Sequence, residues 1–248
     1  MKLEVCCGSY QDVVAAQKGH ADRVELNQAL HMGGLTPSLG TLIQAKKDCT
    51  IPIICMVRNR GAGFCFDASE KALLFEDAKV LLEHGADGLV FGYLHEDFTI
   101  DVEETKRMVE LIHSYHKEAV FHRAFDCVED MDRAMQALIA AHVDRVLTSG
   151  GRKDVTSGKD QLAYLQKTYG NQIEILAGCG VNRDNIKELV VDCGITQVHS
   201  SCKAWKKDPT TIHNEVSYAY ASSEHAYDYD VVDEQKVADL TSIIKQYK

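Results

Sequence analysis

Short apolar runs rich in Val, Ile and Leu occur at intervals along most of the chain. Several of them are nearly continuous instead of alternating with polar residues, which is typical of parallel strands that are covered on both faces. We expect eight strands, at residues 3–7, 23–27, 51–57, 88–92, 118–122, 145–149, 173–178 and 197–201.

The segments between these runs carry apolar residues at the spacing of an amphipathic helix. We expect helices within residues 9–18, 69–84, 102–116, 131–142, 159–169 and 185–193. Polar residues such as Ser69 and Asp130 open two of the segments, where a first helical turn has free N–H groups. Glycines follow four of them, at positions 19, 85, 170 and 194, which is where helices commonly end.

This alternation predicts an α/β fold with a parallel sheet. Eight units in 248 residues, with no Pro-, Gly- or Ser-rich linker, favour a single (β/α)₈ TIM barrel over residues 1–248. A doubly wound open sheet is the main alternative, and the lack of a GxGxxG after the first strand counts against it. Residues 203–233 are rich in aromatic side chains and form an excursion after the eighth strand. The excursion covers the barrel mouth, forms an oligomer interface or is a plain surface segment.

Composition narrows the partners and the compartment. The net charge of −10 argues against binding to nucleic acid or to an anionic membrane surface. The first residues lack the features of a signal peptide, and no apolar run is long enough to span a bilayer, so we expect a cytoplasmic protein. The nine cysteines are odd in number and scattered, which predicts reduced thiols.

Polar, thiol-bearing or glycine-rich residues stand where most of the predicted strands end. In a TIM barrel these ends meet at one face, which holds the ligand site. Carboxylates and histidines can move protons there, and arginines can hold an anion. The candidate catalytic residues are Glu25, Arg58, His122, Arg123, Asp126 and His199. Glu4 and Glu25 have an alternative role, because a glutamate inside a barrel can pair with an arginine and simply fill the lumen.

Glycine-rich sequences end the sixth and seventh strands. Free backbone N–H groups beside the start of a helix hold anions, and TIM barrels often bind phosphate after their last strands. The candidate anion-binding residues are Ser149, Gly150, Gly178 and Gly180. The alternative is that these glycines only allow tight turns between strand and helix.

The chain resembles the CutC family, which is named for copper homeostasis. The resemblance rests on LEVC at 3–6, GHADRVEL at 19–26, GGLTPSLG at 33–40, MVRNRGAGFCF at 56–66, FHRAFD at 121–126, RVLTSGG at 145–151, AGCGV at 177–181 and HSS at 199–201. It implies a cytoplasmic TIM barrel that assembles as a homodimer or homotetramer. It also implies Cu(I) binding by cysteines at strand ends, for which Cys6 is the candidate ligand. Related sequences often end the second strand in VELC, whereas Asn27 stands at that position here.

Two functions follow from these residues. The first is copper handling, with Cu⁺ bound through Cys6, because thiolates are soft ligands that suit Cu(I). The second is an enzyme of the lyase, isomerase or hydrolase type that acts on a small anionic or phosphorylated metabolite. In the enzyme, His122 or Glu25 would move protons while Arg58 and Arg123 held the anion. A scaffold without a ligand is a third function, and the polar strand ends count against it.

Overall fold

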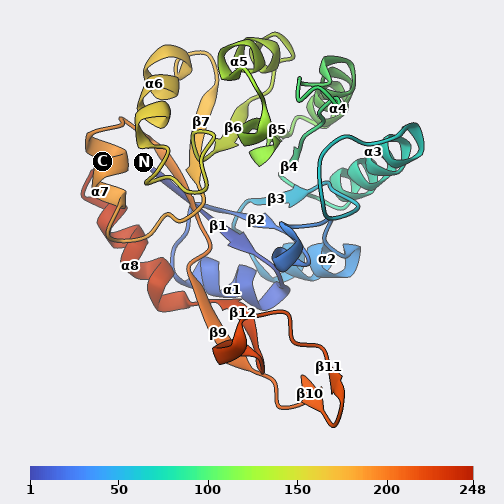
Figure 1. Ribbon diagram of the computed structural model, residues 1–248, viewed down its shortest axis with the longest axis vertical. Helices are drawn as coiled ribbons and strands as arrows, with labels where there is room; N and C mark the ends of the chain where they lie inside the picture. Colours follow the sequence, from blue (N-terminus) through green and yellow to red (C-terminus); the bar gives the residue numbers. More distant parts are fainter. Residues whose placement is uncertain (248) are drawn as a thin grey trace.

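A computed structural model describes residues 1–247 and shows eight parallel strands closed into a barrel (Figure 1). Each strand pairs with the next along the chain, and the eighth pairs with the first. The strands are β1 (Lys2–Cys7), β2 (Arg23–Leu26), β3 (Ile53–Met56), β4 (Gly88–Phe91), β5 (Glu118–Phe121), β6 (Arg145–Thr148), β7 (Glu174–Gly178) and β8 (Gln197–Ser200). The predicted TIM barrel is confirmed, and no strand boundary differs from its prediction by more than two residues.

Helices surround the barrel on its outside (Figure 1). They are α1 (Tyr10–Lys18), α2 (Leu39–Asp48), α3 (Ala68–Glu83), α4 (Val102–Ser114), α5 (Met131–Ala140), α6 (Lys159–Tyr169), α7 (Ile186–Val191) and α8 (Glu234–Lys245). Helix α3 begins earlier than predicted, because Asp67 and Glu70 form a capping box at its start and Ser69 already lies inside the helix. Asp130 caps α5 as expected. Among residues 1–247, no helix has both the length and the apolar character needed to cross a bilayer.

Side-chain alternation gives every barrel strand an outward face and an inward face. The outward side chains, such as Val5, Leu26 and Phe121, are fully buried beneath the helices. The inward side chains of β3, β4 and β5 form a small apolar cluster of Ile54, Met56, Val90 and Val120. The remaining strands direct polar side chains inward, so the lumen is lined unevenly, with an apolar side and a polar side.

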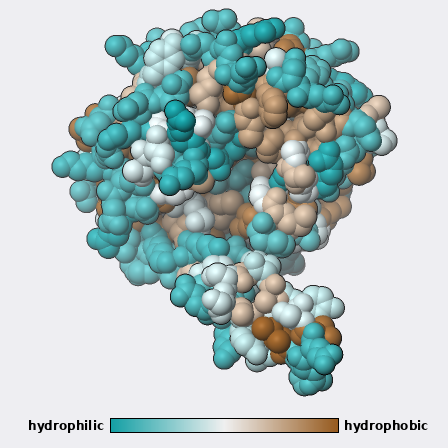
Figure 2. Space-filling view, viewed as in Figure 1, coloured by the Kyte–Doolittle hydropathy of each residue, from teal (hydrophilic) through white to brown (hydrophobic). Residues whose placement is uncertain are grey.

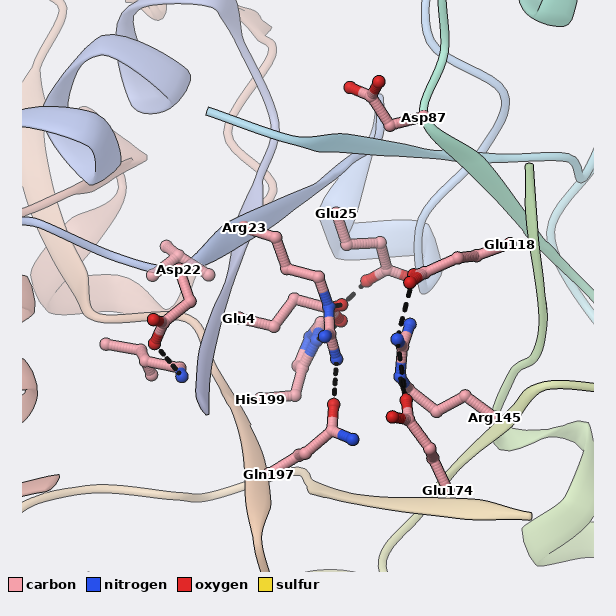
Figure 3. Close-up of polar contacts among 12 residues, drawn as sticks. Glu4, Asp22, Arg23, Glu25, Asp87, Glu118, Arg145, Glu174, Gln197 and His199 are labelled. Carbon is pink, nitrogen blue, oxygen red and sulfur yellow. Dashed lines mark hydrogen bonds and ion pairs between the residues drawn. The ribbon is translucent and has the colours of Figure 1, made fainter. Parts of the chain in front are cut away.

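Ion pairs fill the polar side of the lumen (Figure 3). Glu4 pairs with Arg23, which also donates a hydrogen bond of 2.7 Å to Gln197 Oε1. Arg145, which is 1% exposed, pairs with both Glu118 and Glu174. Glu4 is therefore part of an arginine–glutamate network of the kind expected from the sequence. Glu25 forms no ion pair with an arginine within residues 1–247, and its nearest charged partner is His199.

Residues 203–233 form an arm that projects away from the barrel between β8 and α8 (Figure 1). Strands β9 (Lys203–Lys207) and β12 (Asp228–Val232) pair antiparallel at its base, and β10 (Ile212–His213) and β11 (Val216–Ser217) form its far end. The arm also contains the 3₁₀ helix η3 (Ser223–His225), while η1 (Leu30–Met32) and η2 (Arg123–Cys127) follow β2 and β5. The arm is held to the barrel where Val232 N donates a hydrogen bond of 2.7 Å to Asp12 Oδ1.

Candidate functional site

A cavity of about 860 Å³ opens at the carboxyl ends of the barrel strands. Figure 2 shows a hollow over the centre of the barrel on the face that it presents. Eight of the side chains or glycines proposed from the sequence line this cavity: Cys6, Glu25, Arg58, His122, Arg123, Asp126, Gly180 and His199. Residues far apart along the chain thus share one pocket, because parallel strands place all their carboxyl ends at the same face.

Three potential metal ligands meet on one wall of this cavity. The ligand atoms of Cys6, Glu25 and His199 all lie within 4.8 Å of one another. Strand pairing explains the cluster, since Cys6 is the register partner of Glu25, and Glu4, two residues before Cys6, is the partner of His199. We call these three residues the Cys–Glu–His cluster.

Glu4 fixes the orientation of the histidine in this cluster (Figure 3). His199 Nδ1 lies 2.8 Å from Glu4 Oε1, and Arg23 holds the other oxygen of that carboxylate. His199 Nε2 is therefore directed at Glu25, whose Oε2 is 3.5 Å away. Histidines that bind metals usually donate their other ring N–H to a carboxylate in this way, which fixes the tautomer and the ring orientation.

Burial and neighbouring charges shift the pKa of every member of the Cys–Glu–His cluster. Burial would lower the pKa of His199, but Glu25, Cys6 and Glu4 outweigh it and raise that pKa well above 6.5. Burial raises the pKa of the Glu25 carboxyl and that of the Cys6 thiol. Without a metal, His199 thus favours its protonated form, with Glu4 and Glu25 on either side of the ring. A metal that takes Cys6 and His199 as ligands must displace their protons.

The neighbour of Cys6 at the end of β2 is an amide. Asn27 Nδ2 lies 3.6 Å from Cys6 Sγ. Related sequences often have a cysteine at this position, whereas this chain has a hydrogen-bond donor. Two other cysteines are near but do not replace it. Cys7 is fully buried on the outward face of β1, and the Cys179 thiol donates to Lys153 O at 3.1 Å. The cluster therefore contains a single thiol.

His122 lies on the apolar side of the lumen and has a defined tautomer. Its Nδ1 accepts a hydrogen bond of 3.1 Å from the N–H of Ala124, so the ring proton is on Nε2. Burial, and then the charge of Arg58, lowers the pKa of His122 to about 3. The ring is neutral at ordinary pH. Its Nε2–H is a buried donor with no acceptor among residues 1–247.

Arg58 lies beside His122 and uses most of its donors on the backbone. Its guanidinium donates to the carbonyl oxygens of Met32, Gly34 and Ala62. Its Nε is buried and, within the described chain, has no hydrogen-bond partner. Phe64 packs against both groups, with its ring 4.7 Å from that of His122 and 5.1 Å from the Arg58 guanidinium carbon.

The side chain of Asp126, which belongs to η2 after β5, reaches into the loop that follows β6. It accepts hydrogen bonds from the N–H groups of Ser149 and Gly151, and it pairs with Arg123 at 2.7 Å. The N–H of Gly150 donates to Thr148 Oγ1 at 2.9 Å. The loop in which we predicted an anion site thus already holds a carboxylate of the protein itself, and neither Ser149 nor Gly150 lines the cavity.

The glycines after β7 differ from each other. A Cβ at Gly178 would lie 2.5 Å from Leu147 Cδ1 and 3.2 Å from His199 Cβ, so this glycine allows close packing inside the barrel. Gly180 has a φ of +81°, which favours glycine, and it lines the cavity. Of the four proposed anion-binding residues, Gly180 alone lies at the cavity wall.

Several residues that line the cavity were not among the proposed site residues. Six of them are basic or aromatic: His31, Phe64, Arg152, Lys153, Lys203 and Tyr220. Tyr220 comes from the arm and stacks on His31 with ring centroids 4.6 Å apart. Aromatic residues in segment 203–233 were the only sequence signal for this contact. The sequence gave no signal for the loop residues, because their approach to the cavity depends on the fold.

Comparison with known proteins places this chain in a family. The model of the CutC family matches residues 1–204. A CutC family protein from Treponema denticola is 38% identical over 245 residues, which are 99% of this chain and 98% of that protein. The crystal structure of a CutC protein from Streptococcus agalactiae, named for copper homeostasis, matches with a TM-score of 0.76 and 28% identity. That match covers 81% of this chain and 99% of the other.

A more distant structural match concerns the fold alone. The N-acetylmannosamine-6-phosphate 2-epimerase from Clostridium perfringens aligns with a TM-score of 0.58 over 80% of this chain and 85% of its own, at 16% identity. At that level of identity the match shows that the two chains share a barrel, and it does not extend to activity.

Proposed function

Since this chain belongs to the CutC family, we propose that it binds a metal ion, with copper as its cargo, at the mouth of the barrel. The observation that carries this proposal is the Cys–Glu–His cluster, whose three ligand atoms lie within 4.8 Å of one another. The orientation of His199 by Glu4 supports it, because metal-binding histidines usually hydrogen-bond a carboxylate through the ring nitrogen that does not face the metal.

The donor set agrees with copper and does not exclude its competitors. Cu(I) prefers sulfur, and imidazole nitrogen also binds copper, so Cys6 Sγ and His199 Nε2 would be the main ligands. Glu25 would stand beside them as a third donor, and its Oε1 has no hydrogen-bond partner within residues 1–247. Three mixed protein ligands with room for a fourth are also common for zinc, so Zn²⁺ is the metal to test against copper.

The experiment is a competition titration under anaerobic conditions. Metal-free protein is titrated with Cu(I) and, separately, with Zn²⁺, each against a chelator of known affinity. We expect one equivalent of Cu(I) to bind, and binding to weaken at least about 100-fold in both Cys6→Ser and His199→Asn, since each removes a ligand. Cys65→Ser is the matched control, because Cys65 is an exposed thiol outside the cavity.

The titration can also reject the proposal. Cu(I) affinity that is equal in the wild type, Cys6→Ser and Cys65→Ser would mean that copper binds to any accessible thiol. Tight binding of Zn²⁺ with weak binding of Cu(I), both dependent on Cys6, would keep the site and overturn copper as its metal.

An enzyme is the second candidate function, and Glu25 is the observation that favours it. Its carboxyl has a raised pKa caused by burial, and its Oε1 faces no partner in the described chain, as a general base would require. His122 is less suited to accept a proton, because its Nδ1 already accepts one hydrogen bond and its Nε2 carries the proton. Loss of turnover in Glu25→Gln, with turnover unchanged in Cys6→Ser, would separate this function from metal binding.

A further inference from the structure

Within residues 1–247, two buried N–H donors on the apolar side of the lumen have no hydrogen-bond partner, and neither belongs to the Cys–Glu–His cluster. They are His122 Nε2 and Arg58 Nε. Both residues are 4% exposed and line the cavity, but the two nitrogen atoms have almost no accessible surface. A buried donor that lacks an acceptor is costly, and native proteins seldom keep one without a reason. Two such donors around one aromatic ring indicate a place where an acceptor binds.

The charges at this place define the acceptor. Arg58 is cationic, and within residues 1–247 it contacts backbone carbonyls and forms no ion pair with a carboxylate. His122 is held neutral, so it donates a hydrogen bond without adding a charge. One uncompensated positive charge and two N–H donors match a monoanion with two oxygen atoms better than they match a dianion.

The alternative anion site in this cavity is weaker. The N–H groups of Ser149 and Gly151 already have Asp126 as their acceptor, and Arg123 is paired with the same carboxylate. Arg152 and Lys153 line the cavity, but both side chains are exposed to solvent, where a counter-charge gains little. The buried pair therefore has the greater need for a ligand.

We propose that His122 Nε2–H and Arg58 bind the carboxylate group of a small organic acid in the barrel mouth. Neither donor nitrogen has surface open to the cavity. The ring of Phe64 packs over both residues, so it must turn aside to admit the carboxylate, and it would then cover the apolar part of the ligand. The binding needs no metal, because neither donor belongs to the Cys–Glu–His cluster. It therefore stands or falls separately from the proposed copper site.

The test uses metal-free protein in the presence of EDTA. Propionate is titrated by calorimetry, with propionamide as the neutral probe of the same shape and inorganic phosphate as the competing anion. We expect propionate to bind, propionamide to bind at least tenfold more weakly, and phosphate to bind more weakly than propionate.

Two variants locate the binding. His122→Asn keeps a side-chain acceptor for the Ala124 N–H but lacks the donor at the Nε2 position, so propionate affinity should fall at least tenfold. Arg152→Ala removes an exposed charge from the same cavity and should change the affinity less than twofold. Equal affinity in the wild type and His122→Asn would overturn the proposal, and so would phosphate binding that depends on Arg152.

A measurement on the wild type guards against a variant that fails to fold. In ¹H–¹⁵N spectra of the imidazole groups, the His122 Nε2–H resonance should move downfield when propionate is added, as a new hydrogen bond forms. Propionate that binds without moving this resonance, or that does not bind at all, would contradict the proposal.

Discussion

The side-chain amide of Asn27 lies 3.6 Å from the sulfur of Cys6, across the neighbouring strands β1 and β2. The amide nitrogen donates to the thiol, and it also donates to Glu25 O at 3.2 Å. An amide at this place cannot supply the second soft ligand that Cu(I) prefers. The pair therefore sets the chemistry of the proposed metal site, with one sulfur instead of two.

Asn27→Cys should convert the site into a stronger Cu(I) site. Two thiols on adjacent strands, with His199 beside them, offer a softer ligand set, so we expect Cu(I) affinity to rise at least about tenfold. The competition titration measures it, and Asn27→Ser is the control that removes the amide without adding sulfur. An unchanged affinity in Asn27→Cys would show that Cys6 does not bind the metal.

Glu4→Gln should destabilise the protein strongly. The substitution leaves Arg23 and His199 buried without their carboxylate, and breaking a buried ion pair costs about 3–5 kcal/mol. Denaturation by guanidinium chloride in the presence of EDTA measures the free energy of unfolding. Glu174→Gln is the matched control, because Glu174 is half-exposed and its partner Arg145 still pairs with Glu118. Comparable losses in the two variants would contradict the central position of Glu4 in the network.

The stability of the protein should depend on pH through His122. Its pKa is about 3 in the folded protein and 6.5 is its ordinary value, so below pH 6.5 the unfolded chain takes up a proton that the folded protein excludes. This difference lowers the free energy of unfolding as pH falls, by at most about 1.4 kcal/mol per pH unit between pH 6.5 and pH 3.

The measurement compares the wild type with His122→Asn, which does not titrate. Their unfolding free energies, obtained at pH 7 and pH 5, should differ in slope, with the wild type losing more stability on acidification. Identical slopes would mean that His122 takes up its proton in the folded protein, which its burial beside Arg58 argues against.

Asp126→Ala should loosen the loop after β6. The carboxylate accepts hydrogen bonds from the N–H groups of Ser149 and Gly151. Each buried donor left without an acceptor lowers the free energy of unfolding by about 1–3 kcal/mol. We expect a loss of at least about 2 kcal/mol in unfolding free energy and faster amide hydrogen exchange at Gly151. Glu129→Ala, which removes an exposed carboxylate three residues further along the chain, serves as the control. Unchanged exchange at Gly151 would show that the loop does not depend on Asp126.

Much of this architecture could be predicted because it depends on local patterns. Continuous apolar runs located the eight strands. The pairing of Cys6 with Glu25 depends on the register between β1 and β2, which the sequence did not reveal. On a regular strand, neighbours such as His122 and Arg123 cannot both face the lumen. The strand ends at Phe121, and η2 carries Arg123 to the same cavity.

Other features depend on contacts between distant segments. The loop at Ser149 reads as an anion site in sequence, but a carboxylate 23 residues earlier fills it. Phe64 lies on a loop and reaches His122 only through the closure of the barrel. The arm contributes Tyr220 to the cavity through a pair of antiparallel strands that its sequence did not predict. Contacts of this kind can be identified only from coordinates.

The most direct test is a crystal structure of the copper-loaded protein with diffraction data collected at the copper absorption edge. The proposal predicts one strong anomalous peak within bonding distance of Cys6 Sγ and His199 Nε2, with the Glu25 carboxylate beside it. Anomalous density confined to exposed groups such as Cys65, with none among these three residues, would contradict it.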